Sequence, residues 1–392
     1  MRHLLFTKTE CFLLIAILVS GCMNTIPKEM VNEISKLPDK IDYNYHVKPI
    51  LSDKCFVCHG PDAKNRKANL RLDFNEKFLK ETDSQFQTLD DVKTEIPNRL
   101  LSQDPDTRMP PPESYLNLSD QEIATILKWM EQGGEYKPHW SLISLSKYPL
   151  PKTMEDGWIE NEIDYFVKKK LDEVNISPSI KADKETLIRR LSFTLTGLPP
   201  SLDEIDTFLA DESTYAYEKL IDRLLLSPHY GERMASEWMD VARYADSDGY
   251  LDDKHRDFSP WRDWVINSFN ENLSYEKFVT YQLAGDLIPK ANQSTKIATA
   301  FNRLHKKNSE AGIIFEEYRN EYVADRTITF GKAFLGMTME CARCHDHKYD
   351  PISQKNFYEI SSFFNSTNEI GHAGYGPGQV AGPSLLLTND EQ

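Results

Sequence analysis

The sequence predicts an all-α protein in which a small helical domain is followed by a larger, mostly helical domain. Apolar residues recur at the three- and four-residue spacing of a helix in many segments, and serine, proline and glycine separate these segments. No segment of useful length alternates apolar and polar residues as a half-buried strand would. The 392 residues exceed one typical domain, so we expect more than one hydrophobic core.

The N-terminal region predicts an export signal and a tether. A short basic start precedes an apolar run over residues 12–19, which is too short to cross a bilayer as a helix. The run ends in Leu-Val-Ser-Gly before Cys22 and resembles the lipobox of bacterial lipoproteins. We therefore predict a signal peptide over residues 1–21, a lipid on Cys22 and a tether over residues 22–41. An ordinary secretory signal is the alternative, but it would leave Cys22 as an odd free thiol.

Two five-residue segments carry the strongest chemical signal. Residues 55–59 and residues 341–345 both read Cys-x-x-Cys-His, which is the attachment signature of c-type haem. One helical turn places the two thiols under the two haem vinyl groups, and the histidine that follows can bind the iron. We therefore predict covalent haem at Cys55 and Cys58, with His59 as an axial ligand.

Residues 42–136 predict a small class I-like cytochrome c domain around the first motif. A short helix leads into the motif, and Ser119 and Glu122 form the capping box of a second helix. Between these helices, Met109 lies in a proline-rich loop, from which its thioether can reach the open face of the iron. Met109 is therefore the predicted distal ligand, and His46 is the rival.

The rest of the chain predicts a linker and a second domain. Residues 137–157 contain three prolines and few repeats, as a linker would. Residues 158–392 predict a helical domain that carries the second motif. Its apolar stripes and caps predict helices that include residues 159–171, 187–195, 220–225, 234–244, 261–269, 315–339 and 357–364.

The second motif predicts another covalent haem, at Cys341 and Cys344, with His345 as an axial ligand. A zinc site is the alternative, because thiolates and imidazoles are the usual zinc ligands and His347 is close in sequence. For the distal position of this haem we predict His305. Other candidates for that position are His347, Met337 and Met339, and an iron with an open position is a further option.

An acidic run over residues 246–253 predicts a solvated loop. Its glycine is at the fourth position, whereas an EF-hand calcium loop needs glycine at the sixth, so calcium binding is the minor alternative. Motifs of hydrolases, phosphate-binding loops and zinc proteases are absent from the sequence. The net charge of −15 argues against nucleic acid as a partner.

Several longer segments resemble the large exported cytochrome c proteins that are abundant in planctomycetes and related bacteria. KCFVCHGPDAKNRKANLRLD, RMPPP and LSDQEIATILKWMEQGG resemble the planctomycete-type cytochrome c domain. LIRRLSFTLTGLPPS, YADSDGY, FVTYQLAGDLIP and CARCHDHKYDPISQKNFYEISSFF resemble the domain of unknown function that accompanies it. The resemblance implies haem on Cys55 and Cys58, with His59 and Met109 as axial ligands. Relatives usually continue into a further domain, which is consistent with a C-terminally truncated member.

These features together predict an exported c-type cytochrome with one or two haem c groups. We expect it to exchange electrons with redox partner proteins, while its lipid holds it on the periplasmic or cell-surface side of a bacterial membrane. One alternative is a dihaem redox enzyme, either peroxidase-like or oxidising a carbohydrate-derived substrate. The other is a monohaem cell-surface protein with zinc at the second motif.

Overall fold

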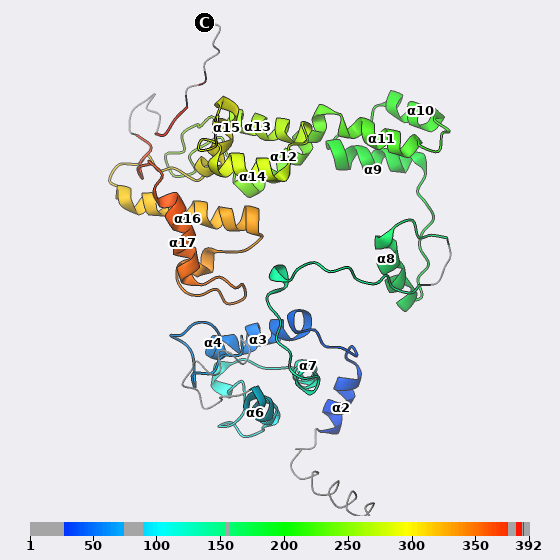
Figure 1. The fold of residues 1–392 in the computed structure, drawn as a ribbon, viewed down its shortest axis with the longest axis vertical. Coiled ribbons are helices and arrows are strands. Elements are labelled where there is room, and N and C mark those ends of the chain that lie inside the picture. The colour runs from blue at the N-terminus through cyan, green and yellow to red at the C-terminus, as the bar shows by residue number, and fades with distance from the viewer. Residues whose placement is uncertain (1–26, 74–88, 154–156, 375–381, 386, 388–392) are drawn as a thin grey trace, which may run out of the picture. The chain divides into compact units, whose positions relative to one another are not determined.

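The computed structural model describes residues 27–73, 89–153, 157–374, 382–385 and 387 (Figure 1). Within these residues the fold is helical and contains no strand, which confirms the predicted all-α class. No helix of this part of the chain is both long enough and apolar enough to cross a membrane. The predicted signal peptide of residues 1–21 and the predicted lipidation site Cys22 lie outside the described residues.

The chain divides into two compact units. The first consists of Met1–Ser144 together with the short segment His345–Ser353, and the second consists of Leu145–Cys344 and Gln354–Gln392. The boundary near the C-terminus therefore falls inside the second Cys-x-x-Cys-His motif, between Cys344 and His345.

Apolar residues from three short helices (η1, α3 and α4) and two longer ones (α6 and α7) contribute to the core of the first unit. Val47, Leu51, Ile126 and Trp129 are almost fully buried in it. The elements of this unit are α2 (Lys28–Ser35), η1 (Tyr43–Val47), α3 (Lys48–Lys54), α4 (Phe56–His59), α6 (Leu89–Leu101), η2 (Pro112–Ser114), α7 (Asp120–Glu131) and η3 (Trp140–Leu142).

Helix α7 begins with the predicted capping box. The Ser119 hydroxyl accepts a hydrogen bond from the Glu122 backbone N–H, and the Glu122 carboxylate accepts one from the Ser119 N–H at 2.7 Å. This reciprocal pair satisfies two N–H groups at the helix start, where no backbone acceptor is available. The cap fixes where α7 starts and hence which of its side chains face the core.

Helix α2 differs from the prediction of a tether over residues 22–41. Met30 of this helix is buried against Ala124 and Leu127 of α7. Helix α2 has only eight residues, so it is too short to be stable by itself and gains its stability from packing on α7.

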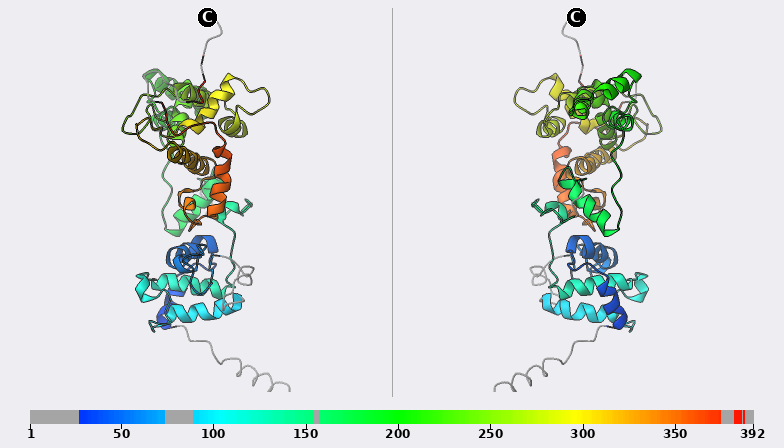
Figure 2. Two further views of the ribbon diagram at one scale, coloured as in Figure 1. Left: turned by 90° about the vertical axis from the view of Figure 1, so that its left-hand side faces the viewer. Right: turned by 90° about the vertical axis from the view of Figure 1, so that its right-hand side faces the viewer.

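The described residues of the second unit include two hydrophobic cores. One joins α9, α10 and α11, and the other joins α12 to α15 with η4 around Trp261 and Phe301. Helices α16 and α17 pack against each other, as the orange segments in Figures 1 and 2 show. The elements of this unit are α8 (Glu162–Glu173), α9 (Lys184–Thr196), α10 (Leu202–Ala210), α11 (Ala216–Leu225), α12 (Pro228–Ala242), α13 (Ser259–Asn270), α14 (Tyr275–Ala284), α15 (Gln293–Ala298), η4 (Thr299–Arg303), α16 (Phe315–Phe330), η5 (Gly331–Leu335), η6 (Glu340–Arg343) and α17 (Gln354–Asn365).

Candidate functional site

A mostly apolar cavity in the first unit brings the residues of the first motif together with the predicted distal ligand. Cys55, Cys58, His59 and Met109 all line it. Its volume is about 200 Å³. Apolar lining comes from Leu51, Leu70, Leu72, Ile96, Leu100, Leu116, Ile126, Trp129, Met130 and Tyr136.

The local backbone explains how the motif faces this cavity. The Cys58 and His59 N–H groups both donate to the Cys55 carbonyl, at 3.1 and 2.8 Å, so the motif forms a single helical turn. The turn ends at Gly60, where an added Cβ would lie 2.3 Å from the Phe56 carbonyl oxygen. Glycine therefore lets the chain turn sharply just after His59.

The loop that carries Met109 is held by α6. The Met109 backbone N–H donates to the Arg99 carbonyl at 3.0 Å, and Pro110 and Pro111 follow it along the wall of the cavity. Prolines restrict the loop, so the thioether has few positions to occupy. Met109 thus reaches the cavity from a segment that is fifty positions away from His59 in the sequence.

Burial shapes the chemistry of the motif side chains. It raises the pKa of the Cys55 thiol to about 12, with the neighbouring Cys58 adding to the effect. It also lowers the pKa of His59, although the backbone at Lys67 and Leu70 opposes this shift. The Nδ1 atom of His59 is buried and has no hydrogen-bond partner among the described residues. A neutral imidazole is the form that binds a metal.

These residues fit a covalently held haem. The cavity is apolar, two cysteines open onto it one helical turn apart, and a histidine and a methionine line it. This donor set suits haem c, because the porphyrin is largely apolar and the iron can take imidazole and thioether ligands.

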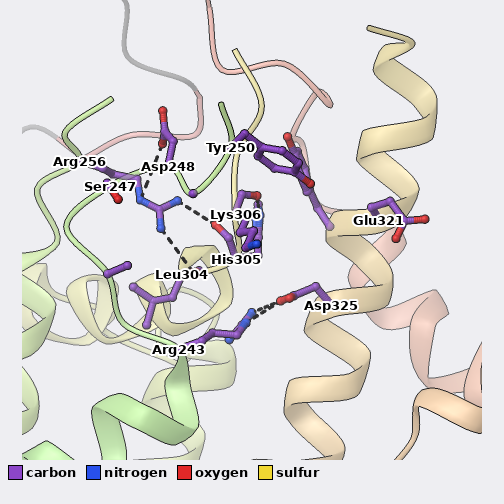
Figure 3. Close-up of a pocket in the computed structure, with 13 residues that line it drawn as sticks. Arg243, Ser247, Asp248, Tyr250, Arg256, Leu304, His305, Lys306, Glu321 and Asp325 are labelled. Atoms are coloured by element: carbon purple, nitrogen blue, oxygen red, sulfur yellow. Dashed lines mark hydrogen bonds and ion pairs between the residues drawn. The ribbon is translucent and has the colours of Figure 1, made fainter. Parts of the chain in front are cut away.

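The second motif has a different environment. Cys341 lies in η6, and both Cys341 and Cys344 are exposed, as is His345. Helix α17 fixes the backbone here, since the Gln354 side chain donates to the Cys344 carbonyl at 2.8 Å. None of these three motif residues lines the cavity of the first unit or the cavity of the second unit shown in Figure 3.

Comparison with known protein families identifies both parts of the chain. A family model described as a protein of unknown function, DUF1549, matches residues 162–369, which is more than half of the 392 residues. The chain belongs to the DUF1549 family. A second model, described as Planctomycete cytochrome C, matches residues 55–113 of this DUF1549 protein, so its first unit contains a cytochrome c-like domain. No curated protein and no solved structure matches the chain.

His305 of this DUF1549 protein lies deep in the second unit. It is 1% exposed, and its ring stacks on Tyr322 with 4.4 Å between the ring centroids. Both ring nitrogens have partners, because Nδ1 lies 2.7 Å from the Lys306 carbonyl and Nε2 lies 2.9 Å from Nη2 of Arg326. Burial lowers the pKa of His305 to about 4, against the opposing effect of Glu369. Its role as the distal ligand of a second haem stays a prediction.

Two further sequence expectations concern metals. Among the described residues, no group of three or more His, Cys, Asp or Glu side chains is arranged to hold a metal ion. The acidic run of residues 246–253 is also not simply a solvated loop, because Asp248 is only 7% exposed. The loop folds inward because the Lys307 N–H donates to the Asp248 carbonyl and Arg256 approaches the Asp248 carboxylate.

Proposed function

We propose that the first unit carries a haem c and transfers single electrons. One observation carries this proposal: Cys55, Cys58, His59 and Met109 meet in one mostly apolar cavity. In this assignment the two cysteine sulfurs hold the haem through thioether bonds, and His59 and Met109 bind the iron.

When bound, haem c supplies an iron that cycles between the ferrous and ferric states. The residues of the chain around the iron would set its reduction potential. Met109 favours the reduced state relative to a second nitrogen ligand. Ile126 and Trp129 from α7 exclude water from the cavity, which also disfavours the more highly charged ferric state. The thioether bonds at Cys55 and Cys58 keep the cofactor in place in both states.

A methionine substitution tests this assignment. Met109→Ala should abolish the methionine-to-iron charge-transfer band in the far red and leave the haem covalently attached. Met130 is a matched control, because it lines the same cavity but is not an assigned ligand. Met130→Leu should keep the band. Survival of the band in Met109→Ala, or its loss in Met130→Leu alone, would show that Met109 is not the ligand.

We extend the proposal to a second haem at Cys341 and Cys344, with His345 as an axial ligand. Its support is the sequence motif, and His305 is the predicted distal ligand. A pyridine haemochrome assay gives the number of haems per chain, and Cys341→Ala with Cys344→Ala should lower it from two to one. A count of one with zinc bound would favour the zinc alternative, and a high-spin second haem that reacts with peroxide would favour the dihaem enzyme.

We also propose that the protein is exported and anchored by a lipid on Cys22, where it exchanges electrons with redox partner proteins. The basic start, short apolar run and lipobox-like residues before Cys22 support this location. Labelling with a radioactive fatty acid in a bacterial host tests it. Label should enter the wild-type chain but not Cys22→Ala, and equal labelling of both would refute lipidation at this position.

A further inference from the structure

A second cavity, in the second unit, has no role in the proposed electron transfer. Its volume is about 300 Å³, which is in the range of small-ligand pockets. Figure 3 shows that three segments surround it: the loop after α12, the loop at residues 304–306 and helix α16. Tyr250 and Tyr322 contribute aromatic surface to its lining.

The carboxylates that line this cavity already have basic partners. Asp325 accepts a hydrogen bond from Nε of Arg243 at 2.6 Å (Figure 3). Glu321 accepts one from Nη1 of Arg343 at 2.9 Å. The third carboxylate, Asp248, lies 3.9 Å from Nε of Arg256. A cation would have to displace one of these pairs to gain a carboxylate ligand, so the lining does not favour a cationic ligand.

Beneath the cavity, basic groups outnumber acidic ones. The carboxylate of Glu369 is 2% exposed and is shared by three cations, Arg303, Lys307 and Arg326; Nη2 of Arg303 lies 3.4 Å away and Nζ of Lys307 lies 2.9 Å away. His305 adds no charge to this balance. Its Nδ1 lies 2.7 Å from the Lys306 carbonyl, its Nε2 lies 2.9 Å from Nη2 of Arg326 and 3.3 Å from Oε2 of Glu369, and burial lowers its pKa to about 4, so the ring is neutral.

Lys306 adds one more positive charge at the lining. It is exposed, no ion pair joins it to another described residue, and its Nζ lies 5.9 Å from the centre of the Tyr250 ring. Around the cavity and its floor, seven basic residues therefore accompany four acidic ones. The seven are Arg243, Arg256, Arg303, Lys306, Lys307, Arg326 and Arg343, and the four are Asp248, Glu321, Asp325 and Glu369.

This local excess is opposite in sign to the net charge of −15 of the whole chain. Positive charges gathered at a concave, partly desolvated site attract an anion, because the low dielectric of the walls strengthens the field inside. A neutral ligand would leave this excess of positive charge without a counter-charge. From the charge balance, the cavity volume and the tyrosine rings, we propose that this cavity binds a small organic carboxylate, with Lys306 as its charged contact.

Isothermal titration of the intact, haem-loaded chain tests the proposal. The probes are citrate, acetate and glucuronate, with glucose as the neutral counterpart of glucuronate. Saturable binding of at least one carboxylate, with no heat from glucose, is the expected result. Absence of binding by all three carboxylates, or equal binding of glucose and glucuronate, would overturn the proposal.

Charge variants locate the binding. Lys306 is exposed, so Lys306→Glu should fold normally and weaken carboxylate binding by about tenfold or more, while Lys306→Arg keeps the charge and should keep the affinity. Lys296→Glu is the matched control, since Lys296 is exposed on α15 and does not line the cavity. Unchanged affinity in Lys306→Glu, or an equal loss in Lys296→Glu, would show that the anion binds elsewhere.

Discussion

The buried ion cluster around Glu369 gives a direct test of how the second unit is stabilised. Glu369→Gln keeps the shape of the side chain and removes its charge. The carboxylate is 2% exposed and lies against Arg303, Lys307 and Arg326. Its loss would leave these three cations without their counter-charge, because burial lowers the pKa of His305 to about 4 and keeps its ring neutral. Breaking a buried ion pair on one side costs about 3–5 kcal/mol.

The lower end of that range is expected for this variant. A glutamine carbonyl can still accept one hydrogen bond, so about 3 kcal/mol of unfolding free energy should be lost. Urea unfolding followed by tryptophan fluorescence measures the loss, since Trp238, Trp261 and Trp264 belong to the core of the second unit.

An exposed pair on α16 supplies the control. Glu316 accepts a hydrogen bond from Arg319 at 2.9 Å, and its side chain is 65% exposed. Glu316→Gln should cost less than about 1 kcal/mol, because water screens the pair. A loss below 1 kcal/mol in Glu369→Gln as well, about equal to that of the control, would refute the view that the cluster is a buried, coupled ion network.

Two further predictions concern the caps and turns. Ser119→Ala removes the capping box of α7 and should lower the unfolding free energy of the first unit by about 1 kcal/mol; a urea midpoint equal to the wild type would contradict this. Ser213 and Lys219 lower the pKa of the Asp211 carboxyl to about 2, so its charge stabilises the fold above about pH 4 and that contribution fades as the pH falls towards 2. Asp211→Asn should therefore show a smaller fall in melting temperature than the wild type as the pH is lowered. A fall as large as that of the wild type would show that the charge of Asp211 does not stabilise the fold.

Local signals let the sequence predict the helices and the first motif's surroundings. Ser119 and Glu122 predicted where α7 starts, and the structure confirms the capping box. Met109 was a candidate because prolines surround it, and the structure places it in the same cavity as His59. These predictions rest on short-range chemistry, which does not depend on how distant segments pack.

The packing between segments that are far apart in the sequence could not be predicted in the same way. The apolar stripe of α8 predicted a helix with a core-facing side, yet Ile163 is 71% exposed and Phe166 is 47% exposed. Periodicity identifies a helix but does not identify its packing partner. The cavity of the second unit was missed for the same reason, because Arg243, Lys306 and Asp325 come from three segments that only the fold brings together.

The two Cys-x-x-Cys-His motifs differ in what surrounds them, and this difference bears on the direction of electron flow. Leu70, Ile126 and Trp129 wall the cavity at Cys55, whereas the thiol-bearing residues Cys341 and Cys344 are exposed. Water stabilises the more highly charged ferric state, so a haem at the exposed motif would have the lower reduction potential. With Met109 as a ligand of the first haem, as proposed, the potential there would be higher and the difference between the two haems larger. In a dihaem chain, an electron would therefore pass from the second motif to the first.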